Sequence, residues 1–301
     1  MNCVFCDGKA FKQYNYPASR YNGKLFQYVL CKTCRLVQID PLPDEADYAK
    51  MYSTEYQENK VDRSILEDTK SPLAGLRFSY NDQFVYIKNN TSSGAKLLDY
   101  GCGNGHFISN AYHNGFHNAY GAEFNPEMVA LLQHEFPSIG FYTIEEILTN
   151  PELKFDAIRL SNVLEHLTNP KEVLAILRER LTEKGILILE GPIEANFYIM
   201  NVFNRLYFNL SKKLNPNKLT LQPPFHIFFS NAENQLKLFE TIGLEKIDYR
   251  IVEHTWPYGK TVLTAQGIKN KFLAFLAIMS KKVSNKLPFN WGNTFLYIGR
   301  K

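Results

Sequence analysis

The sequence has no long hydrophobic run and nothing at its start that resembles a secretory leader. An uninterrupted apolar stretch of about 18 residues, the minimum for a membrane-spanning helix, is absent, so we expect no membrane span. The first ten residues, MNCVFCDGKA, contain no basic stretch followed by an apolar one. This excludes an ordinary secretory signal and predicts a cytoplasmic protein.

The sequence also has little net charge, +4 over 301 residues, and its basic residues are scattered. That value neither requires nor excludes nucleic-acid binding, and we favour a small-molecule partner over nucleic acid. No internal repeat or low-complexity tract is present. The length suits one large domain with a small one beside it. The oligomeric state stays open.

Cysteine is scarce outside the first 34 residues, where four of the five lie as Cys3-x-x-Cys6 and Cys31-x-x-Cys34. Without a secretory signal, paired CxxC motifs indicate metal ligands rather than disulfides, and nothing nearby resembles a redox βαβ unit. Two such pairs supply the four thiolates of a tetrahedral Zn²⁺ site with no open position. We therefore predict a structural zinc ribbon over residues 1–40, with a hairpin at Asn22-Gly23.

Residues 41–92 are predicted to form a helical connector. Aromatic and apolar residues recur there at near-helical spacing, which is typical of packing, although one tyrosine could also reach a ligand site. A second helix is expected at 76–88, and the turn at 91–94 ends it. The first stripe consists of Tyr48, Met51, Tyr52 and Tyr56.

The most informative stretch is KLLDYGCGNGHFI, residues 96–108. A strand, a glycine-rich turn and a helix start are typical of a nucleotide site, because glycines let a ligand approach the backbone and the helix start offers free N–H groups. A dinucleotide turn, G-x-G-x-x-G, would need its third glycine where His106 stands. Asp99, two residues before the first glycine, is not part of that pattern either.

From residue 95 onward, strand-like and helix-like segments alternate. This predicts an α/β fold with a doubly wound, seven-stranded sheet whose ligand site lies at the carboxyl ends of the strands. Glu123 follows the second strand, where an acid can accept hydrogen bonds from ribose hydroxyls. The seven strands are expected at 96–99, 119–122, 141–142, 155–160, 185–189, 244–251 and 293–298.

Together, the DYGCGNG turn at 99–105, Glu123, the strand beginning at Phe155 and the NVLEHL segment at 162–167 resemble class I S-adenosylmethionine-dependent methyltransferases. With the four-cysteine leader, the chain is similar to a bacterial branch that methylates sugars and other small molecules, including enzymes of surface-polysaccharide and natural-product assembly. The resemblance implies a Rossmann-like domain at 93–301 and S-adenosylmethionine as cofactor. The cofactor residues it implies are Asp99, Gly101, Cys102, Gly103, Gly105, Glu123, Phe124, Ser161 and Asn162.

The acceptor is expected to contact an insertion at 193–230, which would form a helical cap or simply pack on the sheet. An oxygen acceptor must lose its proton, and histidine is the usual base near neutral pH. The candidates are His166, after the fourth strand, and His226, at the end of the cap. We favour His226, because the cap should contact the acceptor. Glu165-His166 could instead shape its loop or hold a divalent ion.

Two departures from the sugar C-methyltransferases lead us to expect O-methylation. The larger of those enzymes carry a further domain after the core, which we do not expect here, and the segment around His226 lacks their glutamate–histidine pair. An RNA methyltransferase with a zinc-ribbon leader and a non-catalytic scaffold that binds S-adenosylmethionine stay open as alternatives. The segment 266–287 alternates apolar residues with lysines, so it could lie on a membrane surface or pack as an amphipathic helix.

Overall fold

The computed structural model of the chain describes residues 1–52, 80–217, 219–220, 224–255, 261–263, 265–287 and 289–301. The chain forms two compact units, each described by itself. Unit 1 comprises Met1–Leu42, Gly191–Leu238 and Tyr249–Leu296, and unit 2 comprises Pro43–Glu190, Phe239–Asp248 and Tyr297–Lys301. Tyr56 and residues 76–79, which the sequence assigned to helices, lie outside the described residues.

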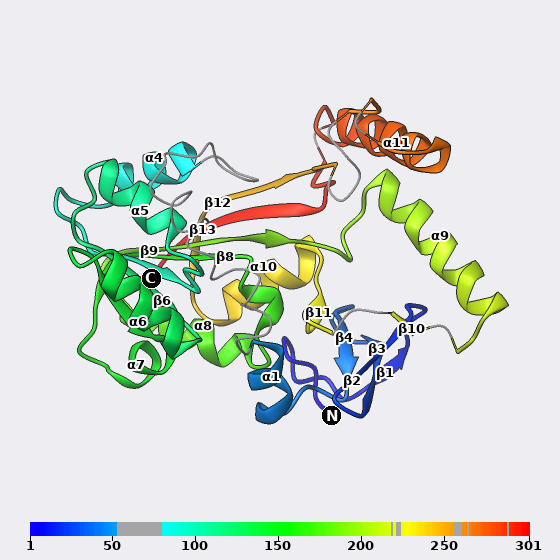
Figure 1. The fold of residues 1–301 in the computed structure, drawn as a ribbon, viewed down its shortest axis with the longest axis horizontal. Coiled ribbons are helices and arrows are strands. Elements are labelled where there is room, and N and C mark those ends of the chain that lie inside the picture. Colours follow the sequence, from blue (N-terminus) through cyan, green and yellow to red (C-terminus); the bar gives the residue numbers. More distant parts are fainter. Residues whose placement is uncertain (53–79, 218, 221–223, 256–260, 264, 288) are drawn as a thin grey trace. The chain divides into compact units, whose positions relative to one another are not determined.

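The larger sheet has seven strands in the order β12-β13-β9-β8-β5-β6-β7 (Figure 1). Its first strand in the chain, β5, pairs in parallel with β6 on one side and with β8 on the other, so the chain winds outward in both directions. The predicted doubly wound α/β fold is therefore confirmed. The strands are β5 (Leu97–Tyr100), β6 (Ala119–Glu123), β7 (Gly140–Thr143), β8 (Phe155–Ser161), β9 (Leu181–Pro192), β12 (Glu245–Val252) and β13 (Thr294–Arg300).

Each predicted strand is present, but β9 begins four residues earlier than the sequence suggested. Its pairing with β8 shifts register, from Phe155 opposite Leu181 to Ala157 opposite Ile186. The residues of β9 between Leu181 and Ile186 outnumber those of β8 between Phe155 and Ala157, so the strand bulges there, and it pairs with β8 on both sides of the bulge. Beyond it β9 is buried almost throughout, as expected for a central strand covered on both faces.

Some of the helices associated with this sheet begin where a side chain caps the first turn. Asn125 accepts hydrogen bonds from the backbone amides of Glu127 and Met128, with Pro126 in the first turn of α6. A short helix that the sequence analysis missed, α7, begins with a capping box at Thr143. The helices are α1 (Glu45–Met51), α4 (Tyr80–Asn90), α5 (His106–His113), α6 (Pro126–Glu135), α7 (Ile144–Thr149), η1 (Leu164–His166), α8 (Pro170–Arg180) and α10 (Ala232–Thr241).

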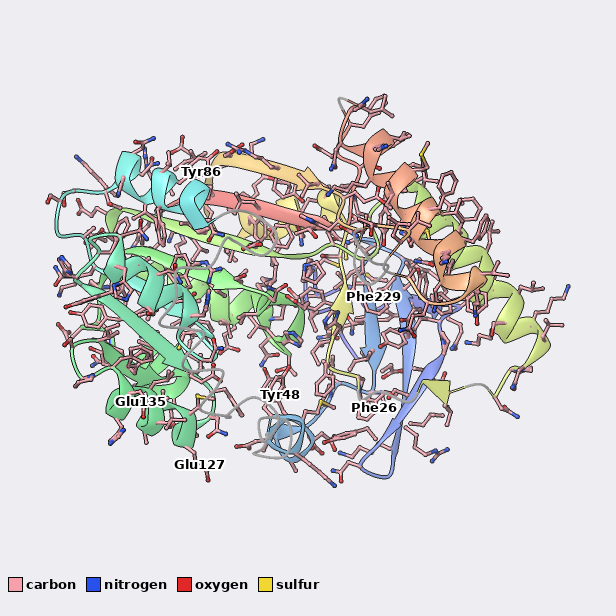
Figure 2. All side chains as sticks on the ribbon, turned by 45° about the horizontal axis from the view of Figure 1, so that its top comes forward. Phe26, Tyr48, Tyr86, Glu127, Glu135 and Phe229 are labelled. Atoms are coloured by element: carbon pink, nitrogen blue, oxygen red, sulfur yellow. The ribbon has the colours of Figure 1, made fainter. Side chains whose placement is uncertain are left out.

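Unit 1 contains a second sheet, in the order β10-β2-β3-β4-β11 with β1 also paired to β3. The predicted hairpin is confirmed: β2 and β3 pair antiparallel around Asn22 and Gly23, both at positive φ, as a tight two-residue turn requires. Phe229, labelled in Figure 2, stacks on Tyr28 with ring centroids 4.9 Å apart. The strands are β1 (Phe11–Gln13), β2 (Ala18–Tyr21), β3 (Lys24–Cys31), β4 (Val37–Asp40), β10 (Leu219–Thr220) and β11 (Phe228–Phe229).

Two longer helices complete unit 1, α9 (Ile199–Leu214) and α11 (Ile268–Ser284), and they contact one another. The backbone amide of Met200 donates a hydrogen bond to Ser280 Oγ at 3.1 Å. None of the helices in the described part of the chain is long and apolar enough to cross a membrane.

Candidate cofactor pocket and cysteine cluster

The glycine-rich turn between β5 and α5 runs through left-handed backbone. Gly101 and Gly103 have φ values of +78° and +57°. A residue that carries a Cβ adopts such values only with strain. A Cβ on Gly101 would stand 2.4 Å from Val163 Cγ2, whereas one on Gly103 would meet open space. The amide of Gly101 donates to Ala122 O on β6 at 2.8 Å, which holds the turn against the next strand.

Glu123, the last residue of β6, fastens the same turn. Its Oε2 accepts a hydrogen bond from the Gly103 amide at 2.9 Å, and its Oε1 accepts one from the Phe124 amide at 2.8 Å. Both bonds leave lone pairs on the carboxylate oxygens, because a carboxylate can accept about four. Glu123 therefore shapes the turn and still offers acceptors to a ligand.

A pocket of about 480 Å³ opens at this edge of unit 2. Its size is in the range of small-molecule and cofactor sites. No lysine or arginine is among the described residues that line it. Six of the residues singled out in the sequence do line it: Gly101, Gly103, Glu123, Phe124, Asn162 and His166.

Four other sequence candidates lie close in the fold but do not line the pocket: Asp99, Cys102, Gly105 and Ser161. Cys102 is buried, and burial raises the pKa of its thiol well above the ordinary value, so it remains a neutral packing residue. Ser161 donates a hydrogen bond to Glu190 Oε2 at 3.1 Å.

Asp99 belongs to a buried polar network that the sequence analysis did not identify. Arg159 Nη1 donates to Asp99 Oδ1 at 2.7 Å, and Arg159 Nη2 lies 3.6 Å from Glu190 Oε2. Gln83 on α4 accepts from Arg159 Nε and donates to Glu190. The sequence pattern that could have revealed this network is an arginine inside the otherwise apolar strand FDAIRLS. In the sheet, Arg159 on β8 stands directly opposite Asp99 on β5.

His166 lines the pocket together with two tyrosines of the connector, Tyr48 and Tyr52. Its ring meets Tyr52 edge-on with centroids 6.0 Å apart, and its Nε2 lies 3.7 Å from Glu165 Oε1. Burial raises the pKa of Tyr48 to about 12, so its hydroxyl stays protonated at neutral pH and is no base. A histidine ring such as that of His166 can accept a proton near neutral pH. Two tyrosines of the predicted connector thus line this pocket.

His226 lies in unit 1 and has a carboxylate partner. Its Nδ1 is 2.9 Å from Glu194 Oε2, and both side chains are about one-third exposed. A carboxylate at Nδ1 directs the other ring nitrogen outward as a potential proton acceptor. The sequence around His226 contains no adjacent glutamate. In the structure, Glu194, 32 residues earlier in the chain and just after β9, supplies the carboxylate beside His226.

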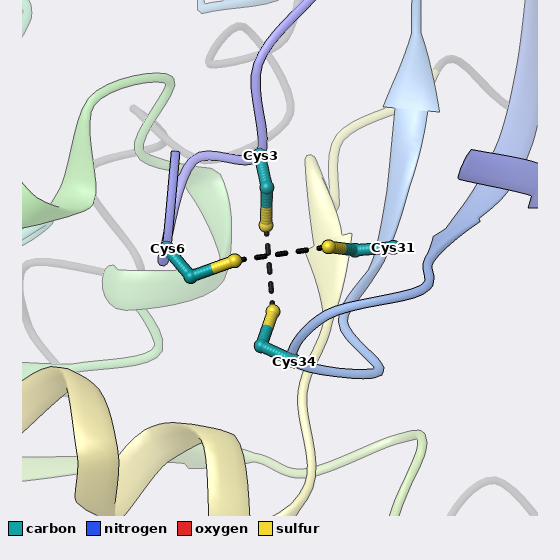
Figure 3. Close-up of side chains that lie close together, drawn as sticks. All are labelled: Cys3, Cys6, Cys31 and Cys34. Atoms are coloured by element: carbon teal, nitrogen blue, oxygen red, sulfur yellow. Dashed lines mark hydrogen bonds between the residues drawn. The ribbon is translucent and has the colours of Figure 1, made fainter. Parts of the chain in front are cut away.

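The four N-terminal cysteines converge on one point in unit 1 (Figure 3). Cys3 Sγ lies 3.5 Å from Cys34 Sγ, Cys6 Sγ lies 3.7 Å from Cys31 Sγ, and all four sulfurs lie within 4.8 Å of one another. Ligands at the usual Zn–S distance on a tetrahedron would be about 3.8 Å apart. The donor set and its spacing fit zinc.

The two CxxC turns have the same backbone. The amide of Asp7 donates to Cys3 O and the amide of Arg35 donates to Cys31 O, each four residues beyond the first cysteine. Both donor residues have positive φ. Each turn therefore directs two thiols toward the same point without help from the other. The hydrogen bond with Cys34 lowers the pKa of Cys3 to about 5, which favours a thiolate in the cluster.

Comparison with known families identifies the class of protein to which the chain belongs. The model of a family described as "Methyltransferase domain" matches residues 77–249, more than half of the chain, and the chain therefore belongs to that family. It is a class I S-adenosylmethionine-dependent methyltransferase. The comparison with curated proteins finds no match.

Several solved structures are similar to the chain. A chain in the complex of the Haloferax volcanii Trm112 methyltransferase activator is 10% identical, with a TM-score of 0.51, over 86% of this chain and 98% of that one. A TehB-like S-adenosylmethionine-dependent methyltransferase from Corynebacterium glutamicum is 16% identical, with a TM-score of 0.47, over 83% of this chain and all of that one. The [4+2]-cyclase SpnF is 15% identical, with a TM-score of 0.47, over 77% and 84%.

The pocket residues fit S-adenosylmethionine. The bare face of Gly103 leaves room for a ligand against the turn, and the carboxylate of Glu123 stands beside it as a hydrogen-bond acceptor. Both are at the carboxyl ends of parallel strands, where ligands bind in such sheets. When bound, the cofactor supplies a methyl group activated by a sulfonium.

Proposed function

We propose that this methyltransferase acts on a hydroxyl group of a sugar, a nucleotide sugar or a similar small polar metabolite in surface-polysaccharide or natural-product biosynthesis. The observation that carries the proposal is His166, a proton acceptor in the wall of the same pocket as Glu123. The absence of lysine and arginine among the described lining residues argues against RNA, whose phosphates need basic contacts.

In this proposal the backbone of the glycine turn and Glu123 hold the cofactor, and Tyr48 and Tyr52 close the pocket against water. Because the methyl donor is already activated, the protein mainly positions the acceptor and removes its proton. His166 takes that proton at Nε2 or Nδ1 as the new carbon–oxygen bond forms. His226, held by Glu194, is the alternative base.

Two measurements test this function. Calorimetric titration with S-adenosylmethionine should show binding to the intact protein, and Glu123→Ala should weaken it. A screen with labelled donor should then methylate a nucleotide sugar or free sugar and leave ribosomal RNA unlabelled. Labelled RNA would favour the alternative acceptor, and an intact protein that does not bind the cofactor would refute the proposal.

The two histidines can be separated by matched variants. His166→Asn and His226→Asn remove the base while keeping a polar side chain, and loss of the base should lower kcat about 10²–10⁴-fold. We expect this loss in His166→Asn with unchanged cofactor affinity. If His226→Asn alone shows it, the base is the Glu194-bound histidine.

We further propose that the cysteine cluster binds one structural Zn²⁺ and that the enzyme works in the cytoplasm, where thiols stay reduced. Four thiolates leave no open coordination position, so the ion would stabilise unit 1 and take no part in methyl transfer. Metal analysis of protein purified without chelator should give one zinc per chain. Cys6→Ser with Cys34→Ser should abolish it, and undiminished zinc in that variant would refute the assignment.

A further inference from the structure

The helices α9 and α11 of unit 1 expose large apolar side chains in regular stripes. On α9 these side chains recur every three or four residues, so they share one face. Leu206 and Leu210 are 61% and 58% exposed. The stripe of α9 consists of Phe203, Leu206, Tyr207, Leu210 and Leu214.

α11 repeats the pattern, and Phe272 and Phe275 are 59% and 50% exposed. Its buried face carries only small residues, among them Ala274 and Ala277. This reverses the usual order, in which the large apolar residues of a surface helix face the core. The stripe of α11 consists of Ile268, Phe272, Phe275, Met279 and Val283.

Contacts on their other faces hold both helices in place within unit 1. Phe208 of α9 packs on Tyr16 with ring centroids 4.7 Å apart. Near the C-terminus of α11, Ser284 Oγ donates a hydrogen bond to Glu253 Oε2 at 2.5 Å. The small-residue face of α11 and the inner face of α9 are therefore engaged, and the large apolar residues remain for another surface.

The charge of the two helices indicates what that surface is. α9 carries three basic residues and α11 carries four, and neither carries an acid, although the whole chain has a net charge of only +4. Lys271 is one helical turn from Phe275, and Lys282 is one turn from Met279, so both flank the stripe. Long basic side chains beside an apolar stripe can reach phosphate groups while the stripe enters the acyl region.

We propose that α9 and α11 form a peripheral binding surface for an anionic lipid bilayer. The apolar stripes would insert at the boundary between headgroups and acyl chains, and the lysines would contact the lipid phosphates. A second copy of the chain is a poorer occupant, because an identical face would bring the same positive charges together. The surface does not depend on the identity of the methyl acceptor, so it can be tested separately from the proposed function.

An aromatic cluster lies close in sequence to the ends of both helices. Trp291 lies with its ring centroid 4.6 Å from that of Phe197, just before α9, and 5.1 Å from that of Phe289, after α11. Tryptophan is enriched at membrane–water interfaces. Trp291 therefore supplies a local reporter, once the other tryptophan of the sequence is replaced in a Trp256→Phe background.

The test is cosedimentation of the full chain with vesicles. We expect the protein to pellet with phosphatidylcholine vesicles that contain about 30% phosphatidylserine, to pellet much less with pure phosphatidylcholine, and to be released between about 0.1 M and about 0.5 M salt. Trp291 fluorescence should shift to the blue with the anionic vesicles only.

Two variants separate charge from burial. Lys271→Gln with Lys282→Gln should weaken binding about 25-fold, from about fivefold per lysine near the surface. Phe272→Ser with Phe275→Ser should weaken it at least about tenfold while retaining the lysines. The matched control, Lys184→Gln with Lys246→Gln, removes the same charge from exposed positions on β9 and β12 and should bind normally.

The proposal is overturned if the intact protein fails to pellet with the anionic vesicles, or if the control loses as much binding as the Lys271 and Lys282 variant. It is also overturned if sedimentation velocity shows a dimer that Phe272→Ser with Phe275→Ser dissociates, because the stripes would then face a second copy. Circular dichroism and cofactor titration of each variant establish that the fold is retained.

Discussion

Arg159→Met should be among the most destabilising single substitutions in unit 2. The guanidinium and the Asp99 carboxylate are 5% and 3% exposed and lie 2.7 Å apart, with Glu190 Oε2 3.6 Å from the same arginine. Removing the arginine leaves two buried carboxylates without a counter-charge. Breaking a buried pair in this way costs about 3–5 kcal/mol of the free energy of unfolding. Methionine preserves the approximate volume, so the loss reports charge rather than a cavity.

The measurement is urea unfolding followed by far-ultraviolet circular dichroism, with cofactor titration on the folded protein. Lys184→Met makes the same change in charge at an exposed position on the neighbouring strand and should alter stability by less than about 0.5 kcal/mol. Adding Asp99→Asn and Glu190→Gln to Arg159→Met removes the two stranded charges. We expect this triple variant to recover most of the lost stability.

Either of two results would refute this reasoning. A cost of under about 1 kcal/mol for Arg159→Met would mean that solvent reaches the network and screens it. A triple variant no more stable than the single one would mean that the shape of the arginine, and not its charge, holds the strands.

Three further predictions concern the cofactor turn and the cysteine cluster. Gly101→Ala should cost about 2–5 kcal/mol, from about 1–2 for positive φ and about 1–3 for overlap with Val163, and adding Val163→Ala should restore only the overlap part in urea unfolding. Glu123→Gln should weaken calorimetric binding of S-adenosylmethionine about 10–100-fold, because an amide nitrogen replaces one acceptor oxygen, while the melting temperature without cofactor changes less. Prolonged treatment with a strong thiol-compatible chelator should lower the melting temperature, and added Zn²⁺ should restore it; no change would argue against a bound ion.

Much of the fold could be predicted because its signals are local. Alternation of apolar strands with helices gave all seven strands of the larger sheet, and Asn22-Gly23 marked a hairpin. These features depend on backbone preferences and on burial of neighbouring residues, which a short window of sequence contains. The helix α7 was missed because it spans only six residues, too few for a helical period to stand out.

The candidate site could be predicted only in part. The glycine turn and Glu123 lie within 25 residues of one another, so motif spacing finds them. The motif identified Asp99, but the buried network around it could not be predicted, because its partner Arg159 lies 60 residues away. Only the register between β5 and β8 brings the two together, because strands adjacent in a sheet need not be adjacent in sequence.

The sequence by itself determined the glycine turn that lines the pocket and the four cysteines that cluster, since both consist of short motifs whose geometry follows from their spacing. Tertiary structure alone decided which residues that are distant in sequence lie together, such as Arg159 beside Asp99 and Glu194 beside His226. It also decided that the apolar stripes of α9 and α11 are exposed. The amphipathic pattern of α11 is present in the sequence, but which of its faces is buried depends on what packs against it. In the structure the small residues of α11 are buried, and its phenylalanines are exposed.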